Sequence, residues 1–299
     1  MQLYRELKRL VEKGYVKKNF DLTDYNSYRL EAVAKICVIV NSIETFIKTM
    51  KVCERRGVKP IILGNGTNVI LARKVIDGVV MIMGKKFNRI DRIGNLLQVE
   101  SGATLEEIIK YSTEEELSGI EGAMGIPASI GGAVYMNASA FDFEMSNIVN
   151  SVLVYSNGKI TVKTGEELKF GYRHSSFQDS GDIIIRVELR LTKSSKSKIE
   201  EKTREIISLR SKKIKSPYPN AGSVFKNGNN YFAGELIDKC GLKNYNIGNA
   251  YVSQTHANFI ENRGKATASE IIGLIEHIKK VVLDKFDVKL ELEQKIIGE

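Results

Sequence analysis

The sequence predicts an α+β protein of two or three compact domains. The chain has 299 residues, and compact domains commonly contain about 100–200 residues each. Hydrophobic residues make up 42% of the chain, which is enough for a sizeable core. Segments with the period of a strand and segments with the period of a helix both occur from one end to the other.

The first third of the chain combines both kinds of pattern. Residues 3–14 predict an amphipathic helix rather than a signal peptide. A β-branched run over residues 34–40 predicts a buried strand, and a helix is expected from Ser42 to Arg56, with Gly57 as its stop. A capping-box pattern at Thr104 predicts a helix that runs toward Gly119. Further extended segments are expected over residues 60–63, 69–71, 78–83 and 96–100.

The rest of the chain continues the mixture. Asn157-Gly158 predicts the turn of a hairpin between residues 148–155 and 159–163. Alternation of Val288, Leu290 and Leu292 with charged residues predicts a strand whose polar face carries Glu291 and Glu293, either in solvent or as an acid or base. We also expect a strand over residues 182–191, followed by a linker over 193–196. Helices are expected from 197 to about 213–215, over 233–239 and from 267 onward. Residues 251–260 predict a strand, a turn and a second strand.

Composition limits the classes of partner. The formal net charge of +9 is compatible with binding to nucleic acid or to an acidic small molecule. It is equally compatible with a solvated, lysine-rich surface that binds neither. No zinc-finger spacing, aromatic RNA-binding signature or helix-turn-helix supports nucleic acid, and we predict no metal site. The 3 cysteines are isolated, which favours a reducing cytoplasm, and the apolar runs are too short to span a bilayer.

Two glycine-rich segments are candidates for binding an anion or a flat ligand. Residues 64–68, Gly-Asn-Gly-Thr-Asn, form either an anion-binding nest or a plain hairpin turn, and a dinucleotide-binding helix is disfavoured because β-branched residues follow. Residues 122–140 are dense in small side chains, which leave little to pack a core and let the backbone approach a planar or phosphorylated ligand. Two such segments in one chain favour a nucleotide-like ligand.

The segment 221–227 concentrates reactive groups. A flexible Ala221-Gly222 pair precedes the hydroxyl of Ser223, and Lys226 and Asn227 add a charge and an amide. The alternative is a polar turn between strands. Arg173 stands among aromatic and hydroxyl side chains, a setting that suits a carboxylate or phosphate as well as a surface ion pair. The neighbouring His174 is either an acid–base group or simply hydrogen-bonded.

Segments spread over nearly the whole chain resemble the UDP-N-acetylenolpyruvoylglucosamine reductase (MurB) family. They occur in the order that the family has them. The matching segments are residues 63–68, 125–138, 172–175, 221–227, 256–260 and 292–298.

The resemblance implies a two-lobed FAD-binding region of the vanillyl-alcohol-oxidase (PCMH) type and a C-terminal α+β substrate domain. The region would span residues 1–194, with lobes of about 1–84 and 85–194, and the substrate domain 195–299, its last strand returning to the active site. FAD would bind non-covalently, with its pyrophosphate at 64–68 and its flavin along 125–137. The implied cofactor-binding residues are Leu63, Gly64, Asn65, Gly66, Thr67, Asn68, Ser101, Gly102, Gly125, Ile126, Pro127, Ala128, Ser129, Gly131, Gly132, Asn137 and Ala138.

The resemblance also implies the activity of a UDP-N-acetylmuramate dehydrogenase in peptidoglycan synthesis. NADPH would reduce FAD, and hydride from flavin N5 would add to C3 of UDP-N-acetylglucosamine enolpyruvate. Arg173 would stabilise the developing enediolate, Ser223 would give C2 its proton, and Glu293, rather than Glu291, would polarise the carboxylate. The implied substrate contacts are Tyr172, Lys213 and Asn227.

Several positions depart from the family pattern. Ala128 and Ser139 stand where glycines are usual, Gly228 stands where proline is usual, and Gln254-Thr255 precedes His256 where a lysine is common. Glu31-Ala32 replaces glycines near the first strand. The short segment after Arg173 matches the form of the enzyme without an inserted tyrosine loop. These differences concern flavin and substrate affinity rather than the reaction.

Three other functions compete with the reductase. Another FAD oxidase on the same fold would leave Arg173, Ser223 and Glu293 unexplained, and no histidine stands near either glycine-rich segment to tether the flavin. A non-catalytic flavin-binding relative would be expected to have lost at least one of the three. A nucleic-acid-binding protein rests on net charge alone. We therefore expect a bacterial cytoplasmic enzyme that needs no obligate protein partner.

Overall fold

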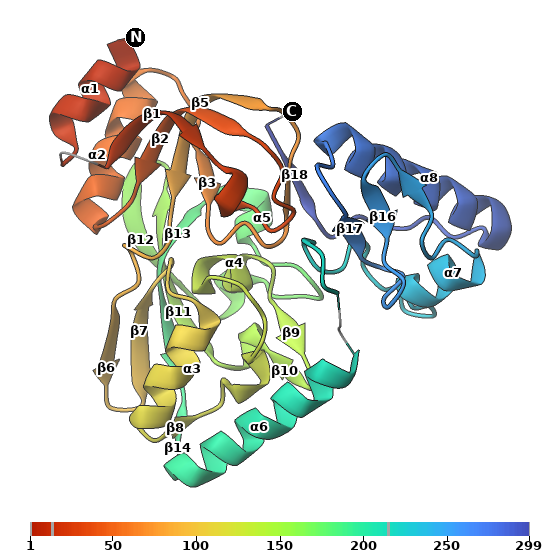
Figure 1. Ribbon diagram of the computed structural model, residues 1–299. Helices are drawn as coiled ribbons and strands as arrows, with labels where there is room; N and C mark the ends of the chain where they lie inside the picture. The colour runs from red at the N-terminus through yellow and green to blue at the C-terminus, as the bar shows by residue number, and fades with distance from the viewer. Residues whose placement is uncertain (1, 13–14, 214–215, 299) are drawn as a thin grey trace. The chain divides into compact units, whose positions relative to one another are not determined.

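The computed structural model describes residues 2–12, 15–213 and 216–298, except for the side chains of residues 212 and 213 (Figure 1). Packing divides the chain into two compact units whose ranges alternate along the sequence. Unit 1 contains Met1–Lys18, Ile36–Asn65 and Gly78–Lys212, and unit 2 contains Asn19–Lys35, Gly66–Asp77 and Lys213–Glu299. The predicted domain boundaries after residues 84 and 194 stay a prediction.

A four-stranded sheet with the order β1-β2-β5-β3 forms from the first part of the chain. α2 begins where the Ser42 hydroxyl accepts a hydrogen bond from the backbone N–H of Thr45, as capping serines do. It buries Phe46, Met50 and Cys53 in a core shared with α1 and β5. The elements are α1 (Gln2–Leu10), β1 (Val16–Asp21), η1 (Thr23–Tyr25), β2 (Val33–Ile39), α2 (Ile43–Arg55), β3 (Ile61–Leu63) and β5 (Val75–Ile82).

The predicted elements of this part are largely confirmed. The strand expected over residues 34–40 is β2, and the helix expected from Ser42 to Arg56 is α2, which ends before Gly57. The helix expected over residues 3–14 is α1, which ends earlier, at Leu10, while residues 13 and 14 lie outside the described residues. Cys37 and Cys53 are buried free thiols, so their contribution here is apolar packing.

A second sheet, in unit 1, is antiparallel and has the order β12-β11-β13-β7-β6 (Figure 1). Asn157 and Gly158 have positive φ angles and make the predicted hairpin turn between β11 and β12. α3 begins with the predicted capping box of Thr104 and Glu107 and shares a core with this sheet. The elements are β6 (Ile90–Ile93), β7 (Leu96–Glu100), α3 (Leu105–Glu114), β11 (Val149–Ser156), β12 (Lys159–Thr164) and β13 (Ile183–Arg190).

The small-residue segment 122–140 is more structured than the sequence suggests. Ile130, Ala133 and Val134 of a short helix are buried in the core, so the expectation that this segment has little to pack is wrong for the helix. A two-residue turn at Phe141 and Asp142, both with positive φ, then closes a small hairpin. The elements are η2 (Glu121–Ala123), α4 (Ile130–Tyr135), β9 (Ser139–Ala140) and β10 (Phe143–Glu144).

The last helix of unit 1, α6 (Lys196–Lys213), starts sooner than expected. The linker predicted over residues 193–196 shrinks to Ser194 and Ser195, because Lys193 pairs with Leu117 and Lys196 begins the helix. Lys196 forms an ion pair with Glu114 at 2.7 Å, which holds the start of α6 to the end of α3. The remaining elements of unit 1 are β8 (Leu117–Ser118), η3 (Met145–Asn147), η4 (Gly165–Leu168), α5 (Phe177–Ser180) and β14 (Thr192–Lys193).

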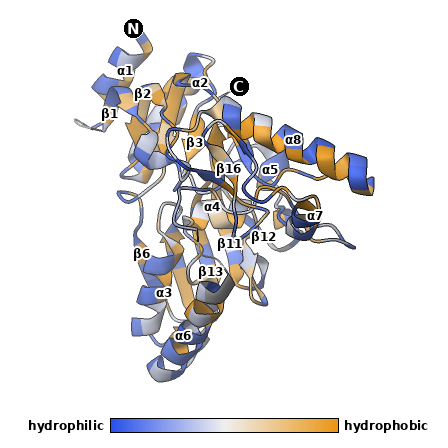
Figure 2. Cartoon of the chain, turned by 45° about the vertical axis from the view of Figure 1, so that its right-hand side comes forward, coloured by the Kyte–Doolittle hydropathy of each residue, from blue (hydrophilic) through white to orange (hydrophobic). Residues whose placement is uncertain are grey.

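Unit 2 packs α8 against the three-stranded sheet β15-β16-β17. α8 begins with a capping box of Thr267 and Glu270, ends at Asp287 in the left-handed region, and shows apolar and polar stripes in Figure 2. Its apolar stripe is buried, and in the described part of the chain no helix has the length and apolarity needed to cross a membrane. The elements are α7 (Ala233–Lys239), β15 (Asn246–Ile247), β16 (Ala250–Val252), β17 (Ile260–Asn262) and α8 (Ala268–Phe286).

A two-stranded parallel sheet joins distant parts of unit 2. β4 (Val69–Leu71) pairs with β18 (Lys295–Ile297), while β3, which precedes residues 64–68, pairs with β5. The strands on either side of residues 64–68 therefore belong to different sheets, and the plain-hairpin interpretation of this loop is wrong. The strand predicted around Leu290 is also wrong, because only a single bridge between Leu292 and Phe225 forms there.

Gly66 provides a test of how tightly this loop is built. Its φ is +65°, and a Cβ atom there would overlap the backbone carbonyl oxygen of Tyr25. Gly57 has a similar φ of +61° with nothing within 4 Å of the equivalent Cβ position. We expect Gly57→Ala to lower the free energy of unfolding by about 1 kcal/mol, the cost of the left-handed backbone, and Gly66→Ala to lower it by at least about 3 kcal/mol, since a backbone carbonyl cannot rotate away.

Urea denaturation of the FAD-free proteins measures both losses without a contribution from cofactor binding. Equal losses for Gly66→Ala and Gly57→Ala would contradict the proposed overlap.

Candidate active site

Ser223 lies on an extended segment of unit 2. Two other segments flank it, one with Phe259 and one with Glu293. On one side it forms a bridge with Phe259, and Val224 N–H donates to the Asn258 carbonyl at 2.8 Å. On the other side, Glu293 N–H donates to the Val224 carbonyl at 2.8 Å. Backbone hydrogen bonds therefore bring Ser223 and Glu293, which are remote in sequence, onto adjacent segments.

Asn258 fixes the backbone just beyond Ser223. It is 4% exposed. Its side-chain oxygen accepts a hydrogen bond from Phe225 N–H at 3.0 Å, and its side-chain amide donates to the Phe225 carbonyl at 2.8 Å. A buried amide that satisfies both backbone groups of one residue specifies that residue's position. Sequence reasoning gave Asn258 no role, although it belongs to the matched segment 256–260.

The two carboxylates near the C-terminus have different surroundings. The Glu291 side chain is 69% exposed and forms an ion pair with Lys226 at 2.5 Å. Glu293 is half-buried, and its carbonyl accepts a hydrogen bond from the Asn68 side-chain amide at 3.3 Å. Lys295 N–H in turn donates to the Asn68 carbonyl at 3.0 Å. These contacts bring Asn68, the last residue of the glycine-rich segment 64–68, beside Glu293. Glu291 remains an exposed ion-pair partner of Lys226.

His256 contributes a neutral ring close to Phe259, the bridge partner of Ser223. The two ring centroids are 4.3 Å apart. Burial lowers the pKa of His256, so the imidazole is uncharged near neutral pH. Nδ1 is shielded from solvent and has no hydrogen-bond partner among the described residues. The His256 ring therefore packs against Phe259 and does not supply a positive charge.

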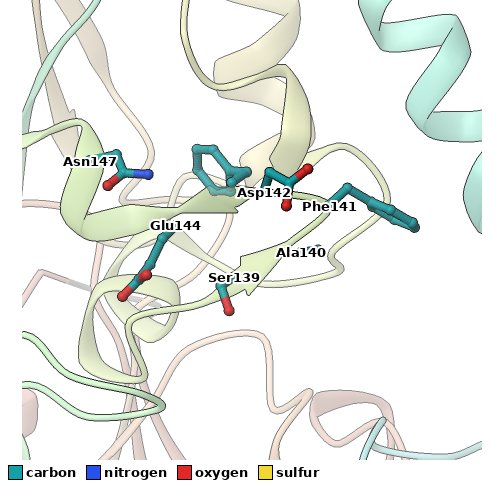
Figure 3. A pocket seen from close by; sticks show the side chains of 7 residues that line it. Ser139, Ala140, Phe141, Asp142, Glu144 and Asn147 are labelled. Carbon is teal, nitrogen blue, oxygen red and sulfur yellow. The ribbon is translucent and has the colours of Figure 1, made fainter.

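Arg173 occupies a tight turn of unit 1. Its φ is 53°, and the flanking residues Gly171 and His174 pair across the turn. Its Nη1 donates to the Ser139 hydroxyl at 2.6 Å and to the Ser139 carbonyl at 3.4 Å. The guanidinium carbon lies 5.4 Å from the centre of the Tyr172 ring. Arg173 therefore contacts the small hairpin β9–β10 (Figure 3), and its role toward a carboxylate or phosphate stays a prediction.

Hydrogen bonds attach this turn to the predicted flavin segment. The Gln178 side-chain amide donates to the carbonyls of Arg173 at 3.0 Å and Tyr135 at 2.9 Å. The Ser175 hydroxyl also donates to Tyr135, at 2.7 Å, and Asn137 donates to the Gly171 carbonyl at 2.9 Å. The turn and the end of α4 therefore form one connected structure, in which the predicted cofactor residue Asn137 helps position the predicted catalytic Arg173.

His174, beside Arg173, has a simpler environment. Its Nε2 lies 3.2 Å from the Asp179 carboxylate. Asp179 is therefore a partner of the His174 side chain, and the choice between an acid–base role and a simple hydrogen-bonded role stays a prediction.

The start of the first glycine loop packs on the second glycine-rich segment. The Asn65 side-chain amide donates to the Pro127 carbonyl at 3.2 Å. A Cβ atom at Gly64 would overlap the Ser129 hydroxyl, which itself accepts a hydrogen bond from Gly132 N–H at 3.4 Å as the N-cap of α4. A side chain at position 64 would therefore displace the Ser129 hydroxyl from its N-cap position.

The polar groups around this junction fit a cofactor such as FAD. Ser101 Oγ is buried and has no hydrogen-bond partner in the described residues. A Cβ atom at Gly131 would lie 2.9 Å from Ser101 Cβ, so the absence of a side chain keeps the region beside this hydroxyl open. A buried, unsatisfied hydroxyl is costly unless a ligand pairs with it. Ser101, a predicted cofactor residue, therefore suits a ligand rich in hydrogen-bond acceptors.

The predicted site residues are distributed over both units. Arg173, Tyr172, Leu63, Gly64, Asn65 and the cofactor residues from Ser101 to Ala138 belong to unit 1. Ser223, Glu293, Asn227, Gly66, Thr67 and Asn68 belong to unit 2. The Asn227 side-chain oxygen accepts a hydrogen bond from Ala233 N–H at 3.0 Å at the start of α7. The side chain of Lys213 lies outside the described residues, and the contact of all three catalytic candidates stays a prediction.

Two family descriptions match separate parts of this chain. Residues 34–164 match the family described as FAD binding domain. Residues 213–297 match the family described as UDP-N-acetylenolpyruvoylglucosamine reductase, C-terminal domain. The chain is 37% identical over 302 aligned residues to the UDP-N-acetylenolpyruvoylglucosamine reductase of Clostridium perfringens strain SM101, covering 100% of this chain and 98% of the relative. This chain belongs to the UDP-N-acetylenolpyruvoylglucosamine reductase family.

Solved structures confirm the fold expected of a UDP-N-acetylenolpyruvoylglucosamine reductase. The crystal structure of the family member from Thermus caldophilus matches with a TM-score of 0.79 and 31% identity, covering 94% of this chain and 97% of that chain. An alkyldihydroxyacetonephosphate synthase matches with a TM-score of 0.51 at 15% identity over 64% of this chain and 40% of its own, and so shares the fold alone. The predicted α+β architecture, an FAD-binding PCMH-type region with the reductase family's C-terminal domain, is confirmed.

Proposed function

We propose that this chain reduces the enolpyruvyl ether of UDP-N-acetylglucosamine enolpyruvate to the lactyl ether of UDP-N-acetylmuramate, with NADPH as the reductant. The observation that carries the proposal is that Ser223 and Glu293 stand on adjacent segments joined by backbone hydrogen bonds. The chain that contains them matches its reductase relatives over its full length. A hydroxyl and a carboxylate are the groups that the second half of this reaction needs.

FAD, when bound, supplies the redox chemistry by taking an electron pair from NADPH and passing it to the substrate double bond. Residues of unit 1 hold the cofactor in this proposal. Ser101 offers its unsatisfied hydroxyl, and the junction of Gly64, Asn65 and Ser129 offers backbone close to the ligand. Gly66, Thr67 and Asn68 continue the same loop in unit 2.

The side chains of the proposed trio act on the substrate carboxylate and the carbon beside it. Arg173, fixed at Ser139, presents a permanent positive charge where negative charge develops on the carboxylate. Ser223 donates its hydroxyl proton to C2, a step that requires neighbouring cations to make the resulting alkoxide tolerable. Glu293 holds and polarises the substrate carboxylate through a hydrogen bond, which requires the protonated form or a bridging donor. Tyr172, Lys213 and Asn227 are proposed contacts to the UDP-sugar.

An anaerobic titration tests the function. The FAD-loaded protein is reduced with one equivalent of NADPH, and UDP-N-acetylglucosamine enolpyruvate is then added. We expect the visible flavin bands to bleach and then return rapidly. Bleaching without return would remove this substrate and point to another oxidase of the same fold, and failure to bind FAD would overturn the cofactor assignment.

A further inference from the structure

Gln294 follows Glu293 directly, and its side chain is a buried amide that none of the roles above uses. It is 2% exposed. Its Nε2 donates to the Ala221 carbonyl at 3.2 Å and to the Gly222 carbonyl at 3.3 Å, and these two residues immediately precede Ser223. One side chain therefore joins the chain just after Glu293 to the chain just before Ser223.

The two carbonyls also determine which way the amide of Gln294 points. A carbonyl oxygen only accepts hydrogen bonds, so the nitrogen of the amide must face Ala221 and Gly222 and its oxygen must face away from them. That oxygen accepts a hydrogen bond from the Tyr28 hydroxyl at 3.0 Å. Burial raises the pKa of Tyr28, so the hydroxyl keeps the proton that it donates. The hydrogen bonds therefore run in one direction, from Tyr28 through Gln294 to the two carbonyls.

Tyr28 is itself fixed in the core of unit 2. Its side chain is 0% exposed and packs in the same hydrophobic cluster as Val224 and Phe225. Its backbone carbonyl accepts a hydrogen bond at 2.8 Å from the side-chain amide of Asn262, which is 3% exposed. Asn262 in turn accepts a hydrogen bond from Ala266 N–H at 2.9 Å. The chain of hydrogen bonds that reaches Gln294 therefore starts from a buried, fixed residue.

Ser223 thus has a buried amide on each side of it along the chain. Asn258 holds both backbone groups of Phe225, which follows Ser223 by two residues, and Gln294 holds the two residues that precede Ser223. A buried, hydrogen-bonded amide specifies one position for the groups that it joins. Gln294 differs from Asn258 because it is also the neighbour of Glu293 in the chain. It therefore acts on the positions of both Ser223 and Glu293.

We propose that Gln294, oriented by Tyr28, is a positioning residue that sets the separation of Ser223 and Glu293 for the transfer of a proton to the substrate. The inference rests on the proposed function for the roles of Ser223 and Glu293. Displacement of a reacting group by about 1 Å slows a reaction by roughly 10²-fold. Sequence reasoning assigned no role to Tyr28 or Gln294, and both are buried, so they act through the backbone that they hold.

Three variants and a matched control test the positioning role. Gln294→Met keeps the approximate volume of the side chain and removes both of its hydrogen-bonding groups. Tyr28→Phe removes only the hydroxyl that orients the amide, and a double variant carries both changes. Tyr155→Phe is the control in unit 1, because Tyr155 is 5% exposed and its hydroxyl donates a hydrogen bond to Glu54 at 2.8 Å.

Anaerobic stopped-flow absorbance of the FAD-loaded proteins measures flavin reduction by NADPH and the limiting rate of reoxidation at saturating UDP-N-acetylglucosamine enolpyruvate. We expect Gln294→Met to slow reoxidation roughly 10- to 100-fold, and Tyr28→Phe to slow it roughly 3- to 10-fold. Flavin reduction should stay within about twofold of the wild-type rate in both, because it does not use the proton donor. The double variant should be no slower than Gln294→Met, because Tyr28 acts through Gln294. Tyr155→Phe should leave both rates unchanged.

Hydrogen exchange measures the same positioning without any reaction. Mass spectrometry of the FAD-loaded full chain follows deuterium uptake in a peptide that covers residues 220–225. We expect its backbone amides to exchange roughly 10-fold faster in Gln294→Met than in the wild type, because the segment is held by fewer hydrogen bonds. A peptide that covers β13 of unit 1 should exchange at the wild-type rate in both proteins.

Three kinetic results would overturn the inference. Reoxidation of Gln294→Met within about twofold of the wild-type rate would show that the amide is not needed. Reduction and reoxidation that slow together would show that Gln294 has only a structural role. A double variant slowed by the product of the two single effects would show that Tyr28 does not act through Gln294.

The two readouts separate this inference from the proposed reaction. A wild-type flavin that the enolpyruvyl substrate does not reoxidise would contradict the proposed reaction. Faster exchange over residues 220–225 in Gln294→Met would still support positioning by Gln294 in that case, and unchanged exchange would overturn it. If Gln294→Met does not fold, the rates and the exchange of Tyr28→Phe decide by the same criteria.

Discussion

Ser223→Ala is expected to separate the two halves of the reaction. Reduction of the bound flavin by NADPH should proceed at nearly the wild-type rate, while reoxidation by UDP-N-acetylglucosamine enolpyruvate slows roughly 10²- to 10⁴-fold. The reason is that the serine hydroxyl supplies a proton only to the substrate carbon. Anaerobic stopped-flow absorbance at the flavin band measures both rates in one preparation.

The structure makes Ser223→Ala a clean substitution. The position of residue 223 is set by backbone pairing with Phe259 and by the Asn258 amide, neither of which involves the serine hydroxyl. Ser269→Ala, at an exposed site near the start of α8, is the control and should leave both rates unchanged. Normal reoxidation in Ser223→Ala would remove the serine from its role, and loss of both half-reactions would indicate damage to the flavin site instead.

Glu293→Gln should have a comparably large effect, and Glu291→Gln is its internal control. Glu291 is exposed and paired with Lys226, so its loss removes a surface ion pair that contributes about 0–1 kcal/mol to stability. Glu293 lies one hydrogen-bonded segment away from Ser223. We expect Glu293→Gln to slow flavin reoxidation by the substrate roughly 10²- to 10³-fold, and Glu291→Gln to change it less than threefold.

Rates across the pH range add a second readout for this pair. A glutamine at position 293 cannot titrate, so any dependence of reoxidation on a carboxyl at that position should disappear in Glu293→Gln and persist in Glu291→Gln. Equal rates for the two variants would show that the choice of Glu293 over Glu291 is wrong.

Local patterns predicted most of the regular elements, because their causes are local. The capping boxes at Thr104 and Thr267 and the Asn157-Gly158 turn are each decided by a few neighbouring residues. The strand expected around Leu290 did not form although its alternation is correct. A strand requires a partner over several residues, and among the described residues this segment has only the bridge between Leu292 and Phe225.

The candidate site was only partly predictable. Ser223, Glu293 and Arg173 were proposed because they stand in segments that match a family, and their contacts could not have been derived from spacing. Asn258 was missed for a physical reason. It is one polar residue whose role depends on burial and on what it faces, and neither property leaves a periodic signal in the sequence.

The parallel pair β4–β18 has a consequence for how the protein is made. Asn68, just before β4, and Glu293, just before β18, are 225 positions apart in the chain. A ribosome that adds about 5–20 residues per second needs roughly 11–45 s to cover that distance. During this time the edge of β4 has no partner, and an exposed strand edge invites pairing with other chains. A chain that stops short of β18 therefore leaves the edge of β4 unpaired, and we expect such incomplete copies to aggregate more readily than the full chain.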